Sequence, residues 1–203
     1  MPIVKPMYTV LPGWIKRHVF GLLLLVVCLL LQGMGLADGF RFDRMLIAQG
    51  NYWLLLSAHF VHLNWSHLWL NLAGLVLVMV FFGRYCAVNV RLAVIFVSAL
   101  SVALGLLWFN DNIHWYVGLS GILHGLFVVG VWHEYRHYAK SGVVLILLLV
   151  AKLIWEQVSG ALPGSESMTG GHVVVDAHLY GALGGLFFLL LHQVVHIYNR
   201  QQN

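Results

Sequence analysis

The sequence predicts an all-α, polytopic membrane protein whose core is a bundle of six transmembrane helices. Hydrophobic residues make up 61% of the chain and charged residues only 9%, which is far from the composition of a soluble domain. The apolar residues are gathered in runs of about 20, the length an α-helix needs to cross hydrocarbon. The few lysines and arginines stand mostly between these runs, where they set the side that each loop faces.

The same composition excludes some functions. The net charge is +4, but so few charges form no basic stripe, so we expect no nucleic-acid partner. Cys28 lies inside the first apolar run and Cys86 between two later ones. They predict neither a disulfide nor a metal site.

The first expected element is the apolar stretch over residues 18–37, which follows a short polar segment, residues 1–17. A secretory signal peptide is the competing interpretation, because Gly35-Leu36-Ala37 resembles a small-residue cleavage site. The stretch is long for a signal peptide and more membrane segments follow it, which favours a retained helix. Residues 38–62 mix charged and aromatic side chains and predict an interfacial loop.

Five further apolar stretches predict the remaining spans, over residues 63–82, 88–109, 117–132, 142–155 and 173–192. The segment at 160–171 is rich in glycine and predicts a loop. No internal repeat or second domain is visible. We therefore expect one six-helix domain over residues 18–195, with a short cytoplasmic segment before it and a cytoplasmic tail, residues 196–203, after it.

The distribution of lysine and arginine predicts the orientation. With the N-terminus inside, the inner segments hold eight of these residues and the outer loops hold only Arg41 and Arg44, while Lys152 lies within a span. The eight are Lys5, Lys16, Arg17, Arg84, Arg91, Arg136, Lys140 and Arg200. Because cytoplasmic loops are enriched in positive charge, both termini are expected in the cytoplasm.

This orientation brings three polar residues to one depth. His67, Ser120 and His178 each lie within the first two turns of a span that begins at the outer face, so all three are within roughly 10 Å of that surface. Small residues four apart indicate that the fourth and sixth spans pack closely. They are Gly121 and Gly125 on one span and Ala177, Gly181 and Gly185 on the other.

These residues suit acyl-transfer chemistry. A serine needs an adjacent base to act as a nucleophile, and histidine is the commonest base. His178 would activate Ser120, while the side chains of His67 and Asn71, four apart on one helix face, would donate to the oxyanion. The amides of Leu119 and Ser120 would add donors if the helix begins there. Asp176 points away from His178, so the pattern predicts a serine/histidine dyad without a carboxylate.

The motifs resemble those of the rhomboid intramembrane serine proteases. Gly118-Leu119-Ser120-Gly121 resembles their GxSG, His67 to Asn71 their HxxxN, and Ala177-His178 with Gly181 and Gly185 their AHxxGxxxG. The resemblance covers about residues 18–195. It implies a rhomboid-like bundle, Ser120 as nucleophile, His178 as base, and His67 and Asn71 as oxyanion-hole residues, with no metal or cofactor. It also implies substrates whose transmembrane segments are cut near the outer face.

Two departures from the family pattern narrow the resemblance. Trp53 is followed by Leu54 where many rhomboids have arginine, which puts the anchoring of the first outer loop in doubt, and His124 stands where many have tyrosine. The short chain, His124 and the run over residues 58–67 are most similar to the rhombosortase branch. That branch implies a bacterial inner-membrane protein whose active site faces the periplasm. Its substrates are secreted proteins with a C-terminal Gly-Gly, a hydrophobic helix and a basic tail.

Two polar features of the spans have structural interpretations. His124 lies one turn below Ser120, where it could pack under His178, tune its pKa or act as an alternative base. Packing is the interpretation we favour. Lys152 and Glu156 are four residues apart on the fifth span and are expected to pair with each other.

Two other functions remain as alternatives. The run from His133 to His137 matches HExxH, in which two histidines bind zinc and a glutamate acts as base. It lies at the expected inner end of the fourth span and lacks a convincing third ligand, so a solvated helix end is favoured. The twelve histidines also allow a metal or haem transporter, but the broken helices in repeated halves that many transporters have are absent.

Overall fold

The computed structural model describes residues 13–201, and within that range the chain is mostly helical. The long helices are α1 (Gly13–Gly33), α5 (Trp65–Phe82), α6 (Val88–Phe109), α7 (Ser120–His137), α8 (Ala139–Ser159) and α10 (Val175–Gln201). The short elements are α2 (Ala37–Phe40), β1 (Phe42–Asp43), α3 (Arg44–Ala48), α4 (Leu54–Ser57), the 3-10 helix η1 (Ala58–Phe60), β2 (Trp115–Tyr116) and α9 (Ser165–Thr169).

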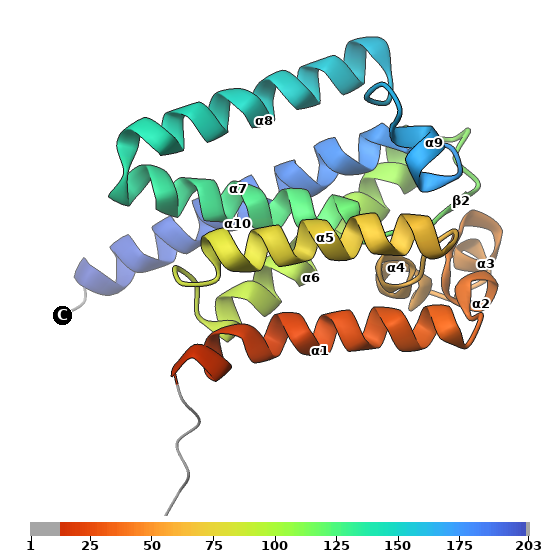
Figure 1. The fold of residues 1–203 in the computed structure, drawn as a ribbon, viewed down its shortest axis with the longest axis horizontal. Coiled ribbons are helices and arrows are strands. Elements are labelled where there is room, and N and C mark those ends of the chain that lie inside the picture. Colours follow the sequence, from red (N-terminus) through yellow and green to blue (C-terminus); the bar gives the residue numbers. More distant parts are fainter. Residues whose placement is uncertain (1–12, 202–203) are drawn as a thin grey trace, which may run out of the picture.

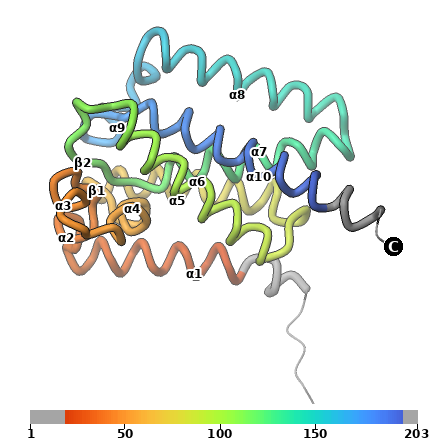
Figure 2. Tube along the Cα trace, turned by 180° about the vertical axis from the view of Figure 1, so that it is seen from behind, coloured from red at the N-terminus to blue at the C-terminus, as the bar shows by residue number. Residues whose placement is uncertain are grey.

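The long helices form a bundle in which α7 is central, in contact with α5, α6, α8 and α10 (Figure 1). Helix α10 packs most extensively on α7 and α6, and α5 lies against α7. Helices α1 and α8 lie on opposite outer sides of the bundle, a placement that Figure 2 shows from behind. Helix α1 begins and α10 ends at the same end of the bundle, and α5, α7 and α10 all begin at the other end.

Four described helices are long and apolar enough to cross a membrane: α5, α6, α8 and the Val175–Val195 part of α10. Helix α1 contributes a shorter apolar stretch, Val19–Gly33. Helix α7 is long enough, but it carries the polar His124 and ends in the His133 to His137 run, which lowers its hydropathy. The structure therefore supports a helical membrane bundle, and the count of six spans remains a prediction.

Glycine allows α7 and α10 to approach closely, as the spacing of small residues predicts. A Cβ atom added at Gly121 would lie 2.8 Å from the carbonyl oxygen of Ala177, and one at Gly125 would lie 2.8 Å from that of Gly181. On α10, a Cβ atom at Gly185 would collide with the backbone of Gly125. Larger residues at these positions would separate the two helices that carry Ser120 and His178.

The short elements between α1 and α5 form a cap over the end of the bundle at which α7 begins. Strand β1 pairs antiparallel with β2, with Phe42 opposite Tyr116. The Arg44 guanidinium donates hydrogen bonds of 2.7–3.2 Å to four carbonyl oxygens at the end of α6 and just beyond it, those of Leu106, Leu107, Asn110 and Ile113. Arg44 thus anchors the loop between α1 and α5, in which Leu54 follows Trp53.

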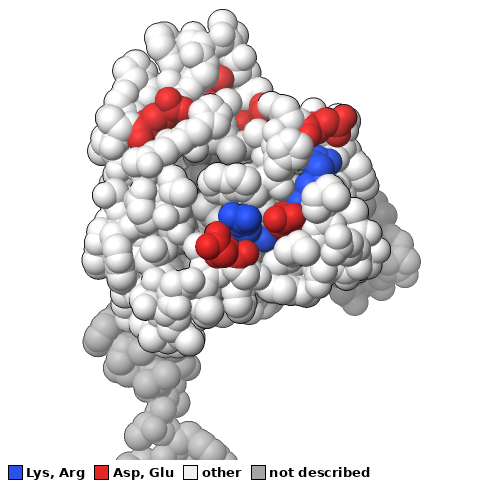
Figure 3. Space-filling view, turned by 90° about the vertical axis from the view of Figure 1, so that its right-hand side faces the viewer, with Lys and Arg blue, Asp and Glu red and all other residues white. Residues whose placement is uncertain are grey.

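The surface of the capped end carries little positive charge. In Figure 3, which looks onto this end, basic side chains form a small group bordered by acidic ones, and most of the face is uncharged. Of the arginines in the loop between α1 and α5, Arg41 lies 3.0 Å from Asp38 and Arg44 lies 3.7 Å from Asp111.

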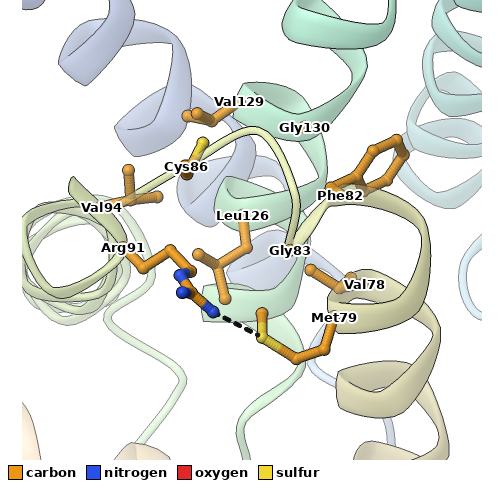
Figure 4. A pocket seen from close by; sticks show the side chains of 10 residues that line it. All are labelled: Val78, Met79, Phe82, Gly83, Cys86, Arg91, Val94, Leu126, Val129 and Gly130. Carbon is orange, nitrogen blue, oxygen red and sulfur yellow. Dashed lines mark hydrogen bonds between the residues drawn. The ribbon is translucent and has the colours of Figure 1, made fainter. Parts of the chain in front are cut away.

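At the opposite end, Arg91 lies within the first turn of α6 and is 4% exposed. Its guanidinium donates to the sulfur of Met79, near the end of α5 (Figure 4). It also lies over the Phe20 ring of α1. Arg91 is therefore part of the packing between α1, α5 and α6.

Candidate active site

The loop before α7 is held in a conformation that only glycine adopts easily. Gly118 has a φ of +124°, its N–H donates to the carbonyl oxygen of Ala58, and its own carbonyl accepts from the Tyr116 hydroxyl at 2.9 Å. A Cβ atom at this position would lie 2.8 Å from Cε1 of His67. The loop therefore places Ser120 at the first position of α7 while leaving room for the His67 ring.

Ser120 and His178 meet as the sequence motifs predict. Nε2 of His178 lies 3.0 Å from Oγ of Ser120, which is within hydrogen-bonding distance. His178 is 7% exposed and lies in the first turn of α10, next to the small residues that bring α10 against α7. The pair lies at the capped end of the bundle.

A carboxylate does orient His178, and the expectation of a dyad without one is wrong. Both carboxylate oxygens of Glu156 lie 3.0 Å from Nδ1 of His178, and Glu156 is only 3% exposed. The error arose because hydropathy ended the fifth span at residue 155, whereas α8 continues to Ser159 and turns Glu156 inward. Asp176 does point elsewhere, since it accepts a hydrogen bond from Asn110.

Glu156 determines which nitrogen of His178 carries the hydrogen. An ionised carboxylate has no hydrogen to donate, so Nδ1 of His178 must be the donor in this contact. In the neutral ring Nε2 is then the acceptor, and it faces the Ser120 hydroxyl. This is the tautomer that a general base needs.

Lys152 and Glu156 form the predicted ion pair, with Nζ 2.7 Å from Oε2. The ammonium also donates to Nε2 of His124 at 2.6 Å, and it lies 3.1 Å from Nδ1 of His178 without a hydrogen bond to it, because Nδ1 carries the hydrogen that goes to Glu156. An ion pair in an apolar span is a signal of function in its own right, because charges there are costly. That signal pointed to Lys152 and Glu156, but not to the partners they would meet.

His124 packs on His178, in agreement with the favoured interpretation. The two rings are stacked with centroids 4.4 Å apart. Nδ1 of His124 donates to the carbonyl oxygen of Ser120, one turn earlier, at 2.7 Å, and Nε2 accepts from Lys152. Because both ring nitrogens have partners other than the Ser120 hydroxyl, the contacts favour packing over an alternative base.

His67 and Asn71 lie beside the Ser120 loop with donors directed toward it. The backbone N–H of Leu63 donates to Nδ1 of His67 at 3.4 Å, which leaves Nε2 to carry the hydrogen and to face Gly118. Asn71 is 4% exposed and uses one amide hydrogen on the carbonyl of His67, so a second hydrogen is available. Leu119 and Ser120 start α7, where amides have no intrahelical acceptor.

A cavity of about 1830 Å³ runs from the capped end of the bundle toward the opposite end, between α5, α7 and α8. Its walls are mostly apolar, with Leu70, Leu77 and Leu148 among them, and Ser120 and His178 open into it. Helix α8, which forms one wall, has only two buried residues, Gly142 and Glu156. The cavity is therefore apolar along most of its length. At the level of Ser120 it has a polar band, made by His67, Asn71, Ser120 and His178.

The HExxH run does not assemble a metal site within the described residues. Glu134 accepts hydrogen bonds from Tyr85 and Ser141, and both His133 and His137 stack on the Tyr85 ring. In the described part of the chain, the group of His, Cys, Asp and Glu side chains with metal-ligand spacing is His124, Glu156 and His178. The run behaves as the polar helix end favoured above.

Two of the histidines expected near the outer loop are packed inside the cap. Burial lowers the pKa of His59 to about 4 and that of His62 to about 3. His59 donates to the carbonyl oxygen of Ala99, and the His62 ring lies edge-on to His67, with centroids 5.2 Å apart. These contacts favour a structural role over a transport pathway.

Comparison with known protein families decides the identity. The Rhomboid domain matches residues 49–193, well over half of the chain and all of the site described above. The chain belongs to the rhomboid family. Rhomboids are intramembrane serine proteases, so this chain is one as well. No curated protein matches it. The part of this rhomboid that precedes the matched region contains α1, which packs against α5.

Proposed function

We propose that this rhomboid cleaves peptide bonds with Ser120 as nucleophile and His178 as general base, oriented by Glu156. The observation that supports this most directly is the chain of contacts from Ser120 Oγ to His178 Nε2 and from His178 Nδ1 to Glu156, each 3.0 Å long. Nucleophile, base and orienting carboxylate in that sequence are the arrangement of a serine hydrolase triad.

In the first half of the reaction, Ser120 Oγ bonds to the carbonyl carbon of the scissile peptide while its proton passes to Nε2 of His178. The negative charge moves onto the carbonyl oxygen, which His67 Nε2–H, Asn71 Nδ2–H and the amides of the first turn of α7 are placed to meet. The carbon–nitrogen bond then breaks, and the leaving amine takes the proton from His178. The acyl group remains on Ser120 as an ester.

In the second half, an acceptor attacks the ester with His178 again as base, and the acyl group leaves Ser120. With water as the acceptor the product is a carboxylic acid. The negative charge of Glu156 stabilises the imidazolium that forms in each half.

The substrates we propose are proteins with a transmembrane segment that reaches Ser120 through the cavity between α5 and α8. The apolar walls suit a segment that leaves lipid, and the polar band satisfies an unwound backbone at the point of cleavage. A helical segment must unwind there, because its carbonyls are otherwise hydrogen-bonded and its scissile carbon is shielded.

For topology, we propose six spans with both termini in the cytoplasm, in a bacterial inner membrane. The active site then lies toward the periplasm. The excess of lysine and arginine on the proposed inner side supports this orientation. So does the scarcity of basic side chains at the capped end, where Arg41 and Arg44 lie close to acidic residues.

At the level of the branch, we propose a rhombosortase-like substrate with a C-terminal Gly-Gly, a hydrophobic helix and a basic tail. His124 and the sequence run over residues 58–67 support this assignment.

The first test is labelling of the purified full chain in detergent with a fluorophosphonate probe. We expect the parent to be labelled, Ser120→Ala not to be labelled and His178→Ala to be labelled weakly. The control Ser141→Ala, at a serine in the first turn of α8, should be labelled like the parent. Undiminished labelling of Ser120→Ala would refute the assignment of Ser120 as the nucleophile.

The rhombosortase-like substrate preference is tested with a reporter that ends in a Gly-Gly tail, compared with one in which Ala-Val replaces Gly-Gly. Equal cleavage of both would refute the Gly-Gly preference.

A further inference from the structure

The ammonium of Lys152 is surrounded by three groups that are typical metal ligands. It lies 2.6 Å from Nε2 of His124, 2.7 Å from Oε2 of Glu156 and 3.1 Å from Nδ1 of His178. The three ligand atoms are all within 4.8 Å of one another. They come from α7, α8 and α10, so the tertiary packing assembles the cluster.

The cluster is built like a cation site and is sheltered from solvent. Glu156 is 3% exposed and His178 is 7% exposed. The ammonium donates to His124 and Glu156 at 2.6 and 2.7 Å, whereas Zn²⁺ binds imidazole nitrogen and carboxylate oxygen at about 2.0–2.2 Å. A metal ion would therefore require the three ligands to move inward by up to about 1 Å each, a shift within reach of side-chain rotation.

We propose that Lys152 is a positioning residue that fills this site with its own cation, and that loss of its ammonium converts the site into a Zn²⁺ site that inactivates the protease. The inactivation rests on the roles proposed for Ser120 and His178. The metal site itself rests only on the geometry of His124, Glu156 and His178.

The charge of Lys152 is needed because Glu156 is buried. An unpaired carboxylate in such a place is strongly disfavoured, and a neutral, protonated Glu156 would no longer be a pure acceptor for His178. With Lys152 present the cluster contains one positive and one negative charge and two neutral imidazoles. The ion pair thereby keeps Glu156 in the form that sets the tautomer of His178.

Lys152 also fixes the ring of His124. Lysine has only donors, so Nε2 of His124 must accept from it, and Nδ1 then carries the hydrogen that goes to the carbonyl of Ser120. The His124 ring supports the stacked face of His178. Lys152 therefore acts on the base from two sides without touching the reacting atoms.

A metal ion at the same place would reverse the chemistry of His178. Coordination uses the lone pair of Nδ1, so the neutral ring keeps its only hydrogen on Nε2. That nitrogen faces Ser120 Oγ and would then donate to the hydroxyl instead of accepting its proton. A protease with Zn²⁺ in the site would thus be folded and inactive.

The test uses the full chain in detergent, free of any histidine tag, as parent, Lys152→Leu and the control Lys140→Leu, an exposed lysine at the start of α8. Of the three proteins, we expect only Lys152→Leu to bind one Co²⁺ per chain, with the visible absorption of a four-coordinate ion. Its fluorophosphonate labelling should fall at least about tenfold further when Zn²⁺ is added, and EDTA should reverse this added loss. Parent and Lys140→Leu should show neither effect.

The Co²⁺-binding measurement does not depend on enzymatic activity. Lys152→Leu combined with Ser120→Ala should still bind Co²⁺, and Lys152→Leu combined with His124→Ala should not. If the parent fails to label but the Co²⁺ results hold, the proposed catalytic roles are wrong and the cation site stands. If the parent labels and folded Lys152→Leu binds no Co²⁺, the inference is overturned.

A second variant covers the case in which Lys152→Leu does not fold. Lys152→Cys can be alkylated with bromoethylamine, which restores an ammonium of almost the same length, or with iodoacetamide, which gives a neutral amide. We expect fluorophosphonate labelling to return only with bromoethylamine. Because Cys28 and Cys86 could also be alkylated, the parent treated with the same reagents is the reference. Equal recovery with both reagents, or with neither, would contradict the role of the charge.

Discussion

The carboxylate of Glu156 lies 3.0 Å from Nδ1 of His178, although the two residues belong to different helices, α8 and α10. The orientation of His178, the proposed base, therefore depends on the position of a helix that carries neither Ser120 nor His178. The contact also selects the tautomer in which Nε2 can accept a hydrogen bond from the Ser120 hydroxyl.

Replacement of Glu156 by glutamine should lower the rate of peptide cleavage by about 10²- to 10⁴-fold. Glutamine keeps the shape but can donate to Nδ1, which favours the wrong tautomer of His178. The rate should be measured with a transmembrane reporter substrate, and Glu156→Asp should recover part of it. Glu166→Gln, at an exposed glutamate in α9, is the matched control and should leave the rate unchanged. Full activity of Glu156→Gln would contradict the orienting role.

Asn71→Ala should lower kcat by about 10²- to 10³-fold with little change in KM, because an oxyanion donor acts mainly in the transition state. Steady-state cleavage in detergent gives both constants. Asn89→Ala, at the exposed start of α6, provides a control with the same substitution. A large rise in KM at constant kcat would show instead that Asn71 holds the substrate.

Gly118→Ala should reduce cleavage by about 10²-fold, because the new Cβ atom must displace the ring of His67. Gly160→Ala separates this clash from backbone strain. Gly160 also has a positive φ, +80°, but nothing lies within 4 Å of the Cβ position. We expect Gly160→Ala to lose some stability and to keep its activity. Equal losses of activity in both variants would mean that strain alone explains the effect at Gly118.

Arg44→Ala should destabilise the protein by about 3 kcal/mol, since four backbone carbonyls lose hydrogen bonds to a charged donor. Arg41→Ala removes a more exposed ion pair and should cost about 1 kcal/mol or less. Thermal unfolding in detergent compares the two variants. A smaller effect at Arg44 than at Arg41 would contradict its role as the anchor of the cap.

Acid should weaken the cap between pH 6.5 and about 4. Burial lowers the pKa of His59 from 6.5 to about 4, so in this interval the unfolded chain binds more protons than the folded one. The free energy of unfolding is therefore highest above pH 6.5 and falls as the pH decreases toward 4. Thermal unfolding at a series of pH values should show this slope, and His59→Gln should reduce it. An unchanged slope in that variant would exclude His59 as a cause.

The sequence was sufficient to predict that Ser120, His178, His67 and Asn71 would lie together. Their motifs lie at the same end of three helices, and the glycine stripe predicts the contact between α7 and α10. The Lys152–Glu156 pair was also predictable from spacing. The direction in which that pair points was not predictable. It depends on how α8 is rotated against α7 and α10, and the sequence of α8 alone does not specify that packing.

Arg44 shows a second limit of sequence reasoning. Its partners are backbone carbonyls more than 60 residues further along the chain, and every residue type presents such a carbonyl. No pattern of side chains could have identified them. The missing arginine after Trp53 correctly drew attention to the anchoring of this loop, but the answer required the tertiary structure.

Helix α8 has two roles that cannot both be met while a substrate segment enters. It borders the cavity through which a substrate segment would pass, and it carries Glu156 to His178. If α8 moves outward to admit a bulky segment, the base loses its orienting partner until the helix returns. A small probe needs no such movement. Assays with small probes and with membrane substrates should therefore rank α8 variants differently, and agreement between them should not be used as the criterion of a well-folded enzyme.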